Sequence, residues 1–198
     1  MQSGIFHPFV RDEKATATVE FVAIMPFFLL IAFFILEISI AIFRVATLEK
    51  AVQLGARVAV VSDPVIAGVP TLNALGGSGA YGTPCSTSGA CAGFATQTCT
   101  GSGCNAAEFA RIANRMRNIF NVADRYITIS YSYAQLGFAG GPLIPSVTVT
   151  VSGVPYEAIV TTIMASFFTR AGGTSPLVNL PPMSVTMTAE DLSTAGAS

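Results

Sequence analysis

The sequence predicts an α+β protein with a long N-terminal transmembrane helix that continues into a stalk, followed by a small domain built on an antiparallel sheet. Three observations predict this fold. Residues 22–43 form an apolar block, a helical repeat continues beyond the block to residue 61, and three later segments alternate between apolar and polar residues. Alternation with a period of two is typical of strands with one buried face, so we expect a sheet of three strands or more.

The composition is unusual in its low share of charged residues, whereas its share of apolar residues is ordinary. Of the 198 residues, 52% are hydrophobic, but only 11% are charged, against about 25% in average soluble domains. Ten Lys and Arg residues against eleven Asp and Glu residues leave no basic excess. This balance excludes nucleic acid as an expected partner. The composition fits a globular or a membrane-associated chain.

The apolar block is long enough to cross a bilayer. Residues 22–43 contain one charged residue, Glu37. A helix of this length measures about 33 Å, and the hydrocarbon core of a bilayer is about 30 Å thick. A buried core helix is rarely apolar on every side, and a cleaved secretory signal has a shorter apolar region that ends at a small-residue site. We therefore interpret the block as a single-pass anchor in the lipid bilayer.

Two residues inside the block are unusual for an anchor. Pro26 removes a backbone hydrogen bond near the start of the helix. Glu37 lies about 9 Å from the far edge of the block. Its carboxylate either reaches the membrane surface or Arg44, or it contacts a neighbouring membrane helix.

The helical repeat continues after the block. Thr47, Lys50, Gln53 and Arg57 recur on one side, and apolar residues line the other side. The pattern predicts one helix over residues 17–61 that ends near Pro64.

The C-terminal part combines a second helix with the strands. Asn105 is expected to cap this helix, with Glu108 completing a capping box. The strands centre on residues 127–133, 147–151 and 185–187. Either the apolar stripe of the second helix or the apolar run at residues 156–168 is expected to cover the sheet. The stripe consists of Phe109, Ile112, Ala113, Met116, Ile119 and Phe120.

Residues 64–104 are rich in Gly, Ser and Thr and are expected to be irregular. Their four cysteines are Cys85, Cys91, Cys99 and Cys104. The spacing lacks the tight pairs of zinc sites, so we expect disulfides. Three connectivities are possible, and we favour the local pairs Cys85–Cys91 and Cys99–Cys104. Disulfides require an oxidising compartment, which places residues 44–198 outside the cytoplasm and the N-terminus inside, although loop charges weakly favour the reverse.

The residue inventory argues against an enzyme. The only histidine is His7, and Lys50 is the only lysine beyond the block. These residues cannot build the usual nucleophilic sites in the outer part, and no phosphate-binding loop is present. The carboxylates of that part show no spacing that would pair them at a site. They are Glu108, Asp124, Glu157, Glu190 and Asp191. We predict no catalytic, metal or cofactor site.

The residues around the block resemble a known family. A short basic N-terminus precedes the sequence TVEF at residues 18–21, and Pro26, Glu37 and the sequence AVQLGARVA at residues 51–59 follow in order. This set resembles the TadE/TadG-like pseudopilins of tight-adherence (Flp, type IV-like) pilus systems. The resemblance implies a minor pilus subunit in the bacterial inner membrane with a periplasmic C-terminal part. It also implies other pilin-like subunits and inner-membrane assembly proteins as partners.

The resemblance also implies a processing site. Some family members are cut by a prepilin peptidase after a glycine, five residues before the glutamate of an E-F or E-Y pair. Glu20 and Phe21 match this pair, so the cut would fall between Ala15 and Thr16, with Ala15 in place of the family's glycine. After such a cut, Glu20 would neutralise the N-terminal amine of a neighbouring subunit.

Together these patterns divide the chain into four parts. Residues 1–16 are a cytoplasmic segment, 17–61 the membrane helix and its extension, 62–104 the cysteine-containing loop region, and 105–198 a periplasmic α+β domain of pilin-like plan. The predicted function is that of a structural subunit that packs through its helix, with Glu20, Phe21, Pro26 and Glu37 as assembly residues. The alternative is a periplasmic binding or adhesion module that the helix merely tethers.

Overall fold

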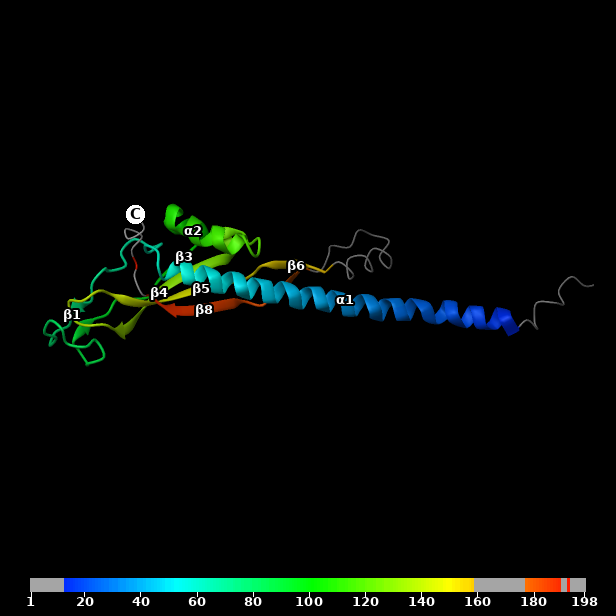
Figure 1. Cartoon of the computed structure of the whole chain (residues 1–198), viewed down its shortest axis with the longest axis horizontal. Coiled ribbons are helices and arrows are strands. Elements are labelled where there is room, and N and C mark those ends of the chain that lie inside the picture. Colours follow the sequence, from blue (N-terminus) through cyan, green and yellow to red (C-terminus); the bar gives the residue numbers. More distant parts are fainter. Residues whose placement is uncertain (1–12, 159–176, 190–191, 193–198) are drawn as a thin grey trace, which may run out of the picture. The chain divides into compact units, whose positions relative to one another are not determined.

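The computed structural model describes residues 13–158, 177–189 and 192 (Figure 1). Contacts divide the chain into two compact units, Met1–Ile42 with Glu157–Pro176 and Phe43–Tyr156 with Leu177–Ser198. His7, Glu190, Asp191 and most of the apolar run at residues 156–168 lie outside the described residues. The start of that run lies in strand β6 (Pro155–Glu157).

The N-terminal helix α1 (Glu13–Ala59) has 47 residues and continues through Pro26. In the first unit, its apolar side chains are exposed to the surroundings, and Phe21 is 64% exposed. Ala17–Ala59 is long and apolar enough to cross a membrane, and none of its most apolar stretch is buried by protein. An apolar helix that protein does not cover indicates a single-pass membrane anchor.

In the second unit, the last part of α1 packs on protein. Its apolar stripe is fully buried and consists of Leu48, Ala51, Val52, Ala56 and Ala59. Lys50, Gln53 and Arg57 on the other side are exposed, as the pattern predicts. Gly55 lies where α2 (Ala106–Arg117) crosses, because an added Cβ would be 2.7 Å from Cγ and Sδ of Met116. The glycine lets the two helices approach closely.

The sheet of this unit has four antiparallel strands in the order β3-β4-β5-β8. The strands are β3 (Gln97–Thr100), β4 (Ile127–Leu136), β5 (Ile144–Val151) and β8 (Met183–Thr188). The α+β plan is therefore confirmed, and β4, β5 and β8 are the three strands that alternation predicts. The expectation that residues 64–104 are irregular is wrong for β3. Its partner strand begins some thirty residues later, so local pattern gave little sign of it.

The two faces of the sheet differ in chemistry. The face toward the helices is apolar, and Ile129, Tyr131 and Val149 on it are fully buried. The opposite face carries Ser and Thr, with hydroxyl pairs across strands at 2.9 Å (Thr100 and Thr128) and 2.8 Å (Thr148 and Thr186). This face provides a polar surface without charge.

Short elements complete the unit. They are β1 (Ala74–Leu75), β2 (Cys91–Ala92), η1 (Gly101–Gly103), η2 (Asp124–Tyr126), β6 (Pro155–Glu157) and β7 (Leu177–Asn179). In α2, the residues Phe109, Ile112, Ala113 and Met116 are buried as expected. Ile119 is 42% exposed because α2 ends at Arg117, before the predicted stripe does.

The cap of α2 agrees only in part with the expected capping box. The Asn105 side chain accepts a hydrogen bond from the Ala107 N–H at 3.2 Å, so Asn105 is the cap. In a capping box, Glu108 would accept the Asn105 N–H. That N–H instead donates to the Val65 carbonyl at 2.7 Å. Glu108 forms an ion pair with Arg111, with 3.6 Å between Glu108 Oε2 and Arg111 Nε. A contact from a distant part of the chain thus replaces the local one.

Tyr131 joins the sheet to the segment after α1. Its hydroxyl accepts a hydrogen bond from the Val65 N–H at 3.2 Å, and both residues are fully buried. Burial raises the pKa of the Tyr131 phenol above its ordinary value of 10.0, the Val65 hydrogen bond lowers it, and the Glu108 charge raises it. A raised folded-state pKa means that the neutral phenol stabilises the fold fully below pH 10, and that this contribution is lost as pH rises through the folded-state pKa.

Replacing Tyr131→Phe should lower the free energy of unfolding by about 1–3 kcal/mol, because it leaves a buried N–H without an acceptor. Tyr133→Phe is the matched control, since the Tyr133 hydroxyl is buried without a hydrogen-bond partner among the described residues. That variant should stay within about 0.5 kcal/mol of the parent. Urea unfolding of the full chain in detergent measures both.

Urea unfolding repeated at rising pH tests the ionisation of the Tyr131 phenol directly. Parent stability should fall as pH rises above 10, and Tyr131→Phe should lack this contribution to the fall. Equal losses of stability in the two variants at pH 7 would contradict the assigned hydrogen bond.

Candidate functional site

The predicted assembly residues lie along α1. Glu20, Phe21 and Pro26 are exposed, and Glu37 is half-buried. Ala15 and Thr16 lie in the first turn of the helix, which begins at Glu13. Glu20 and Glu37 are separated by about 25 Å along the axis and by about 100° around it, at 1.5 Å rise and 3.6 residues per turn. The two carboxylates therefore face different directions, and one straight neighbouring helix cannot contact both equally.

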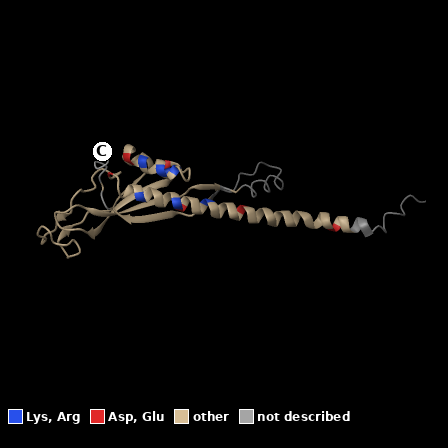
Figure 2. Cartoon of the chain, viewed as in Figure 1, with Lys and Arg blue, Asp and Glu red and all other residues tan. Residues whose placement is uncertain are grey.

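Charge in the second unit is confined to few elements. Figure 2 shows Lys, Arg, Asp and Glu on α1 and α2, and none on the strands at the far end of the unit. Residues 64–107 and 126–156 contain no charged residue at all. The surface that these segments form can contact a partner without removing charges from water.

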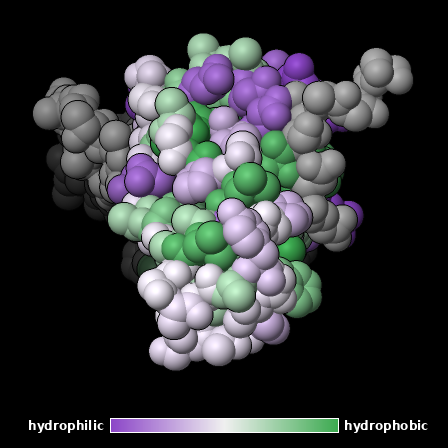
Figure 3. All heavy atoms as spheres, turned by 90° about the vertical axis from the view of Figure 1, so that its left-hand side faces the viewer, coloured by the Kyte–Doolittle hydropathy of each residue, from purple (hydrophilic) through white to green (hydrophobic). Residues whose placement is uncertain are grey.

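Part of this uncharged surface is a small lobe, which we define as residues 71–92 together with 136–143. Backbone hydrogen bonds join the two segments, for example from Cys85 N–H to the Gly137 carbonyl at 2.9 Å. Tyr81 is 80% exposed and Phe138 is 55% exposed. The Tyr81 ring lies against Gly140, where an added Cβ would be 2.3 Å from Tyr81 Cδ1. Figure 3, which views this end of the unit, shows pale and green surface over the lower part of the view.

The disulfides pair as favoured. Cys85 bonds to Cys91 across the lobe, and Cys99 bonds to Cys104, with Cα–Cα distances of 5.1 Å and 5.3 Å. The second bridge joins strand β3 to the residue before the Asn105 cap. Each bridge therefore constrains a segment that has few apolar residues of its own.

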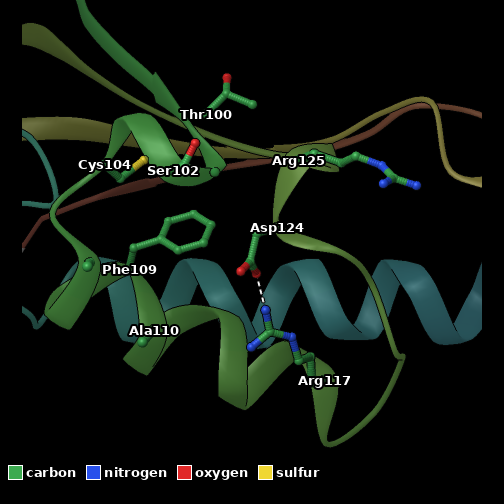
Figure 4. A pocket seen from close by; sticks show the side chains of 10 residues that line it. Thr100, Ser102, Cys104, Phe109, Ala110, Arg117, Asp124 and Arg125 are labelled. Carbon is green, nitrogen blue, oxygen red and sulfur yellow. Dashed lines mark hydrogen bonds and ion pairs between the residues drawn. The ribbon is translucent and has the colours of Figure 1, made fainter.

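A hollow of about 550 Å³ lies beside β3 and α2 (Figure 4). Phe109 faces it, and Asp124 on its edge forms an ion pair with Arg117. Arg117 also donates to Asn114 Oδ1 at 2.9 Å, and Arg125 extends away from the hollow with its guanidinium 4.7 Å from the Tyr126 ring centre. Asp124 and Arg117 thus pair with each other at this hollow, and Arg125 contacts Tyr126 instead.

Metal-ligating side chains do not converge in the described part of the chain, where no group of three or more His, Cys, Asp or Glu residues forms. Of the described carboxylates, Glu108 lies near Arg111 and Asp124 pairs with Arg117. The candidate functional sites of this part of the chain are therefore surfaces. They are the exposed apolar length of α1 and the uncharged surface of the sheet and lobe.

The comparison with known families bears on the first of these surfaces. Residues 15–57 match the family model for TadE-like proteins. The resemblance seen in the sequence is thereby confirmed over almost the whole of α1, and it suggests involvement in a Tad pilus system. No curated protein and no solved structure matches the chain. The TadE-like segment ends before the sheet, so arguments about the sheet and the lobe rest on their own geometry.

Sequence reasoning missed the edge strand β3 and the exposed aromatic residues of the lobe. Gly140 and Tyr81 are distant in sequence, and only the folded lobe brings them together. A weak signal for β3 existed in the sequence QTCT at residues 97–100, where an apolar cysteine lies between two threonines.

Removing each bridge should separate the roles of the two disulfides. The pair Cys99→Ser/Cys104→Ser should lower the free energy of unfolding by about 2 kcal/mol, because it frees a short loop that carries a sheet strand. The pair Cys85→Ser/Cys91→Ser should mainly open the lobe to proteases, with cuts between residues 71 and 92. Urea unfolding and limited proteolysis with mass spectrometry measure these effects. A protected lobe in the second variant would contradict this assignment.

Proposed function

We propose that the chain is a membrane-anchored, minor pseudopilin-like structural subunit that takes part in assembly of a tight-adherence (Flp, type IV-like) pilus. The observation that carries the proposal is a single helix that both matches the TadE-like family and exposes an apolar surface along its first unit. A subunit of this kind works by packing α1 against other pilin-like helices or an assembly platform.

The carboxylates of α1 give this packing its specificity. An unpaired carboxylate in hydrocarbon costs several kcal/mol, so it favours a position next to a defined polar partner. Glu20 is exposed next to the apolar block, so its carboxylate would engage a polar group on a neighbouring helix.

The proposed location is the bacterial inner membrane, with the N-terminus in the cytoplasm and the second unit in the periplasm. Two disulfides support this orientation, because such bonds persist in oxidising compartments. Arg44 supports a boundary at the end of the apolar block, since its guanidinium lies 5.5 Å from the ring centre of Tyr156. The guanidinium thus has a protein partner near the predicted membrane surface.

Glu20→Ala should reduce the number of pili per cell at least tenfold while leaving the protein in the membrane fraction, because the variant keeps an apolar helix but loses a directional contact. Glu49→Ala is the matched control, since Glu49 is an exposed carboxylate on the same helix outside the apolar block. Electron microscopy and membrane fractionation of a complemented deletion strain measure both. Unchanged piliation in Glu20→Ala would remove the proposed role.

The second candidate, a tethered binding or adhesion module, is favoured by the exposed Tyr81 and Phe138 on the uncharged lobe. In the same strain, Tyr81→Ser/Phe138→Ser separates the two functions. If the chain is a pilus subunit, cells with this variant should still form pili. If the chain is a binding module, these cells should lose surface attachment, and Glu20→Ala should leave piliation unaffected. Deleting residues 76–104 would be a poor test, because it removes strand β3 and both disulfides.

Processing between Ala15 and Thr16 is part of the proposal. Ala15→Gly restores the residue that the family has before the cut, so it should raise the fraction of protein cut at this bond. Intact-mass measurement of membrane-extracted protein detects a new N-terminus at Thr16. Glu20→Ala in the same background should alter assembly while leaving the fraction of protein with an N-terminus at Thr16 unchanged. A full-length N-terminus in both the parent and Ala15→Gly would refute processing here.

A further inference from the structure

Among the described residues, the four-stranded sheet ends in two open edges, β3 on one side and β8 on the other. Within residues 13–158 and 177–189, no further strand pairs with either edge. An open edge presents unpaired N–H and C=O groups to any strand that can reach it. The question is which strand fits.

The outer edge of β8 can be read from its hydrogen bonds. The Ala189 N–H donates to the Pro145 carbonyl at 2.9 Å. Because partners alternate along an antiparallel ladder, the backbone groups of Met183, Val185 and Met187 point toward β5. The backbone groups of the residues between them point outward. These residues are Ser184, Thr186 and Thr188.

β8 also lacks the features that usually protect an edge. No residue from 183 to 188 is charged or proline, although charge and proline are the common means of blocking unwanted pairing. Met183, Val185 and Met187 are only half-buried, whereas their counterparts Val147 and Val149 on β5 are fully buried. A hollow of about 500 Å³ adjoins the strand, between Met187 and Val61. An added strand would cover this apolar row.

The outer edge of β3 has the same alternation. The hydroxyl pair of Thr100 and Thr128 marks a non-hydrogen-bonded position of the ladder. The backbone of Cys99 therefore points toward β4, and the backbones of Thr98 and Thr100 point outward. Both threonine side chains are exposed on the hydroxyl face, and Cys99 is buried on the apolar face. On both edges, the residues with outward-pointing backbone groups are Ser or Thr, and their side chains lie on the hydroxyl face of the sheet.

We propose that β8 of one copy pairs antiparallel with β3 of a second copy, so that the sheet continues from subunit to subunit. Three successive antiparallel pairs make β3 and β8 run in opposite directions within one sheet. If a second copy is displaced sideways without being inverted, its β3 can lie next to β8 of the first copy and runs antiparallel to it. The inference rests on the proposed function, because anchorage in one membrane gives all copies the same orientation.

Other self-pairings do not meet this condition. A two-fold β8–β8 pair would invert one copy along the strand direction, and the part of α1 that belongs to the second unit runs along the strands of that unit (Figure 1). The two helices would then enter their domains from opposite sides, which a shared membrane forbids. The β8–β3 contact joins two different surfaces, so it can repeat without closing.

The contact is expected to be weak outside the membrane. β3 has four residues, and only Thr98 and Thr100 present outward backbone groups. Confinement of anchored copies to one plane raises their effective concentration. Pairing should therefore be seen in membranes and lost on dilution in detergent.

Cysteine cross-linking in native membranes tests the proposal. Thr98→Cys is combined in one chain with Ser184→Cys, Thr186→Cys or Thr188→Cys, which covers the possible registers. Opposed residues lie within disulfide distance, so at least one combination should give a reducible ladder of dimers, trimers and larger species. Thr98→Cys/Thr148→Cys is the control, because Thr148 lies on the same face in the central strand β5. Peptide mapping should show both native disulfides intact.

Each other outcome overturns the inference. No ladder in any register, a dimer from Thr186→Cys alone, or a cross-link from β8 to a different protein would each exclude β8–β3 pairing between copies. Pilus counts in a deletion strain separate this failure from failure of the proposed function. Pili that require the chain, without a ladder, refute only the sheet contact. Pili that form without the chain refute the function itself.

Discussion

The buried stripe of α1 is the contact on which the rest of the domain depends. A four-stranded sheet with one apolar face needs a cover, and Leu48, Val52 and Ala56 provide part of it without any solvent exposure. Gly55 lets α2 pack beside them and complete the cover. Because the same helix continues into the apolar block, the element that holds the domain together also attaches it to the membrane.

The shortage of charge follows from this division of the helix. The first unit exposes apolar side chains that suit lipid, so charge there would be costly. The second unit needs little charge for a different reason. Its outer sheet face is made polar by Ser and Thr hydroxyls, and its lobe is held by a disulfide. Both surfaces remain compatible with water, yet both can be covered by a partner without desolvating charges.

Features with a local cause could be predicted from the sequence, and features with a distant cause could not. The helix and strands β4, β5 and β8 follow from periodicity, and the disulfides follow from short spacing. Strand β3 was missed because it forms by pairing with β4, where Cys99 lies opposite Ile129, thirty residues away. The capping box failed because the Val65 carbonyl takes the Asn105 N–H. For the candidate site, Glu20 and Glu37 stand out in sequence, but the matching of the β3 and β8 edges needs the strand order.

An unprotected edge strand has different consequences in a soluble protein and in an anchored one. In solution, copies meet in every orientation, and an open edge such as β8 invites uncontrolled aggregation. A shared membrane removes inverted encounters and leaves only sideways approaches. Under that restriction the uncharged edge of β8 becomes a usable contact, since β3 is the edge of the described four-stranded sheet that a sideways neighbour presents in the antiparallel sense. The anchor thus does more than hold the domain in place, because it selects which of the possible sheet contacts can form.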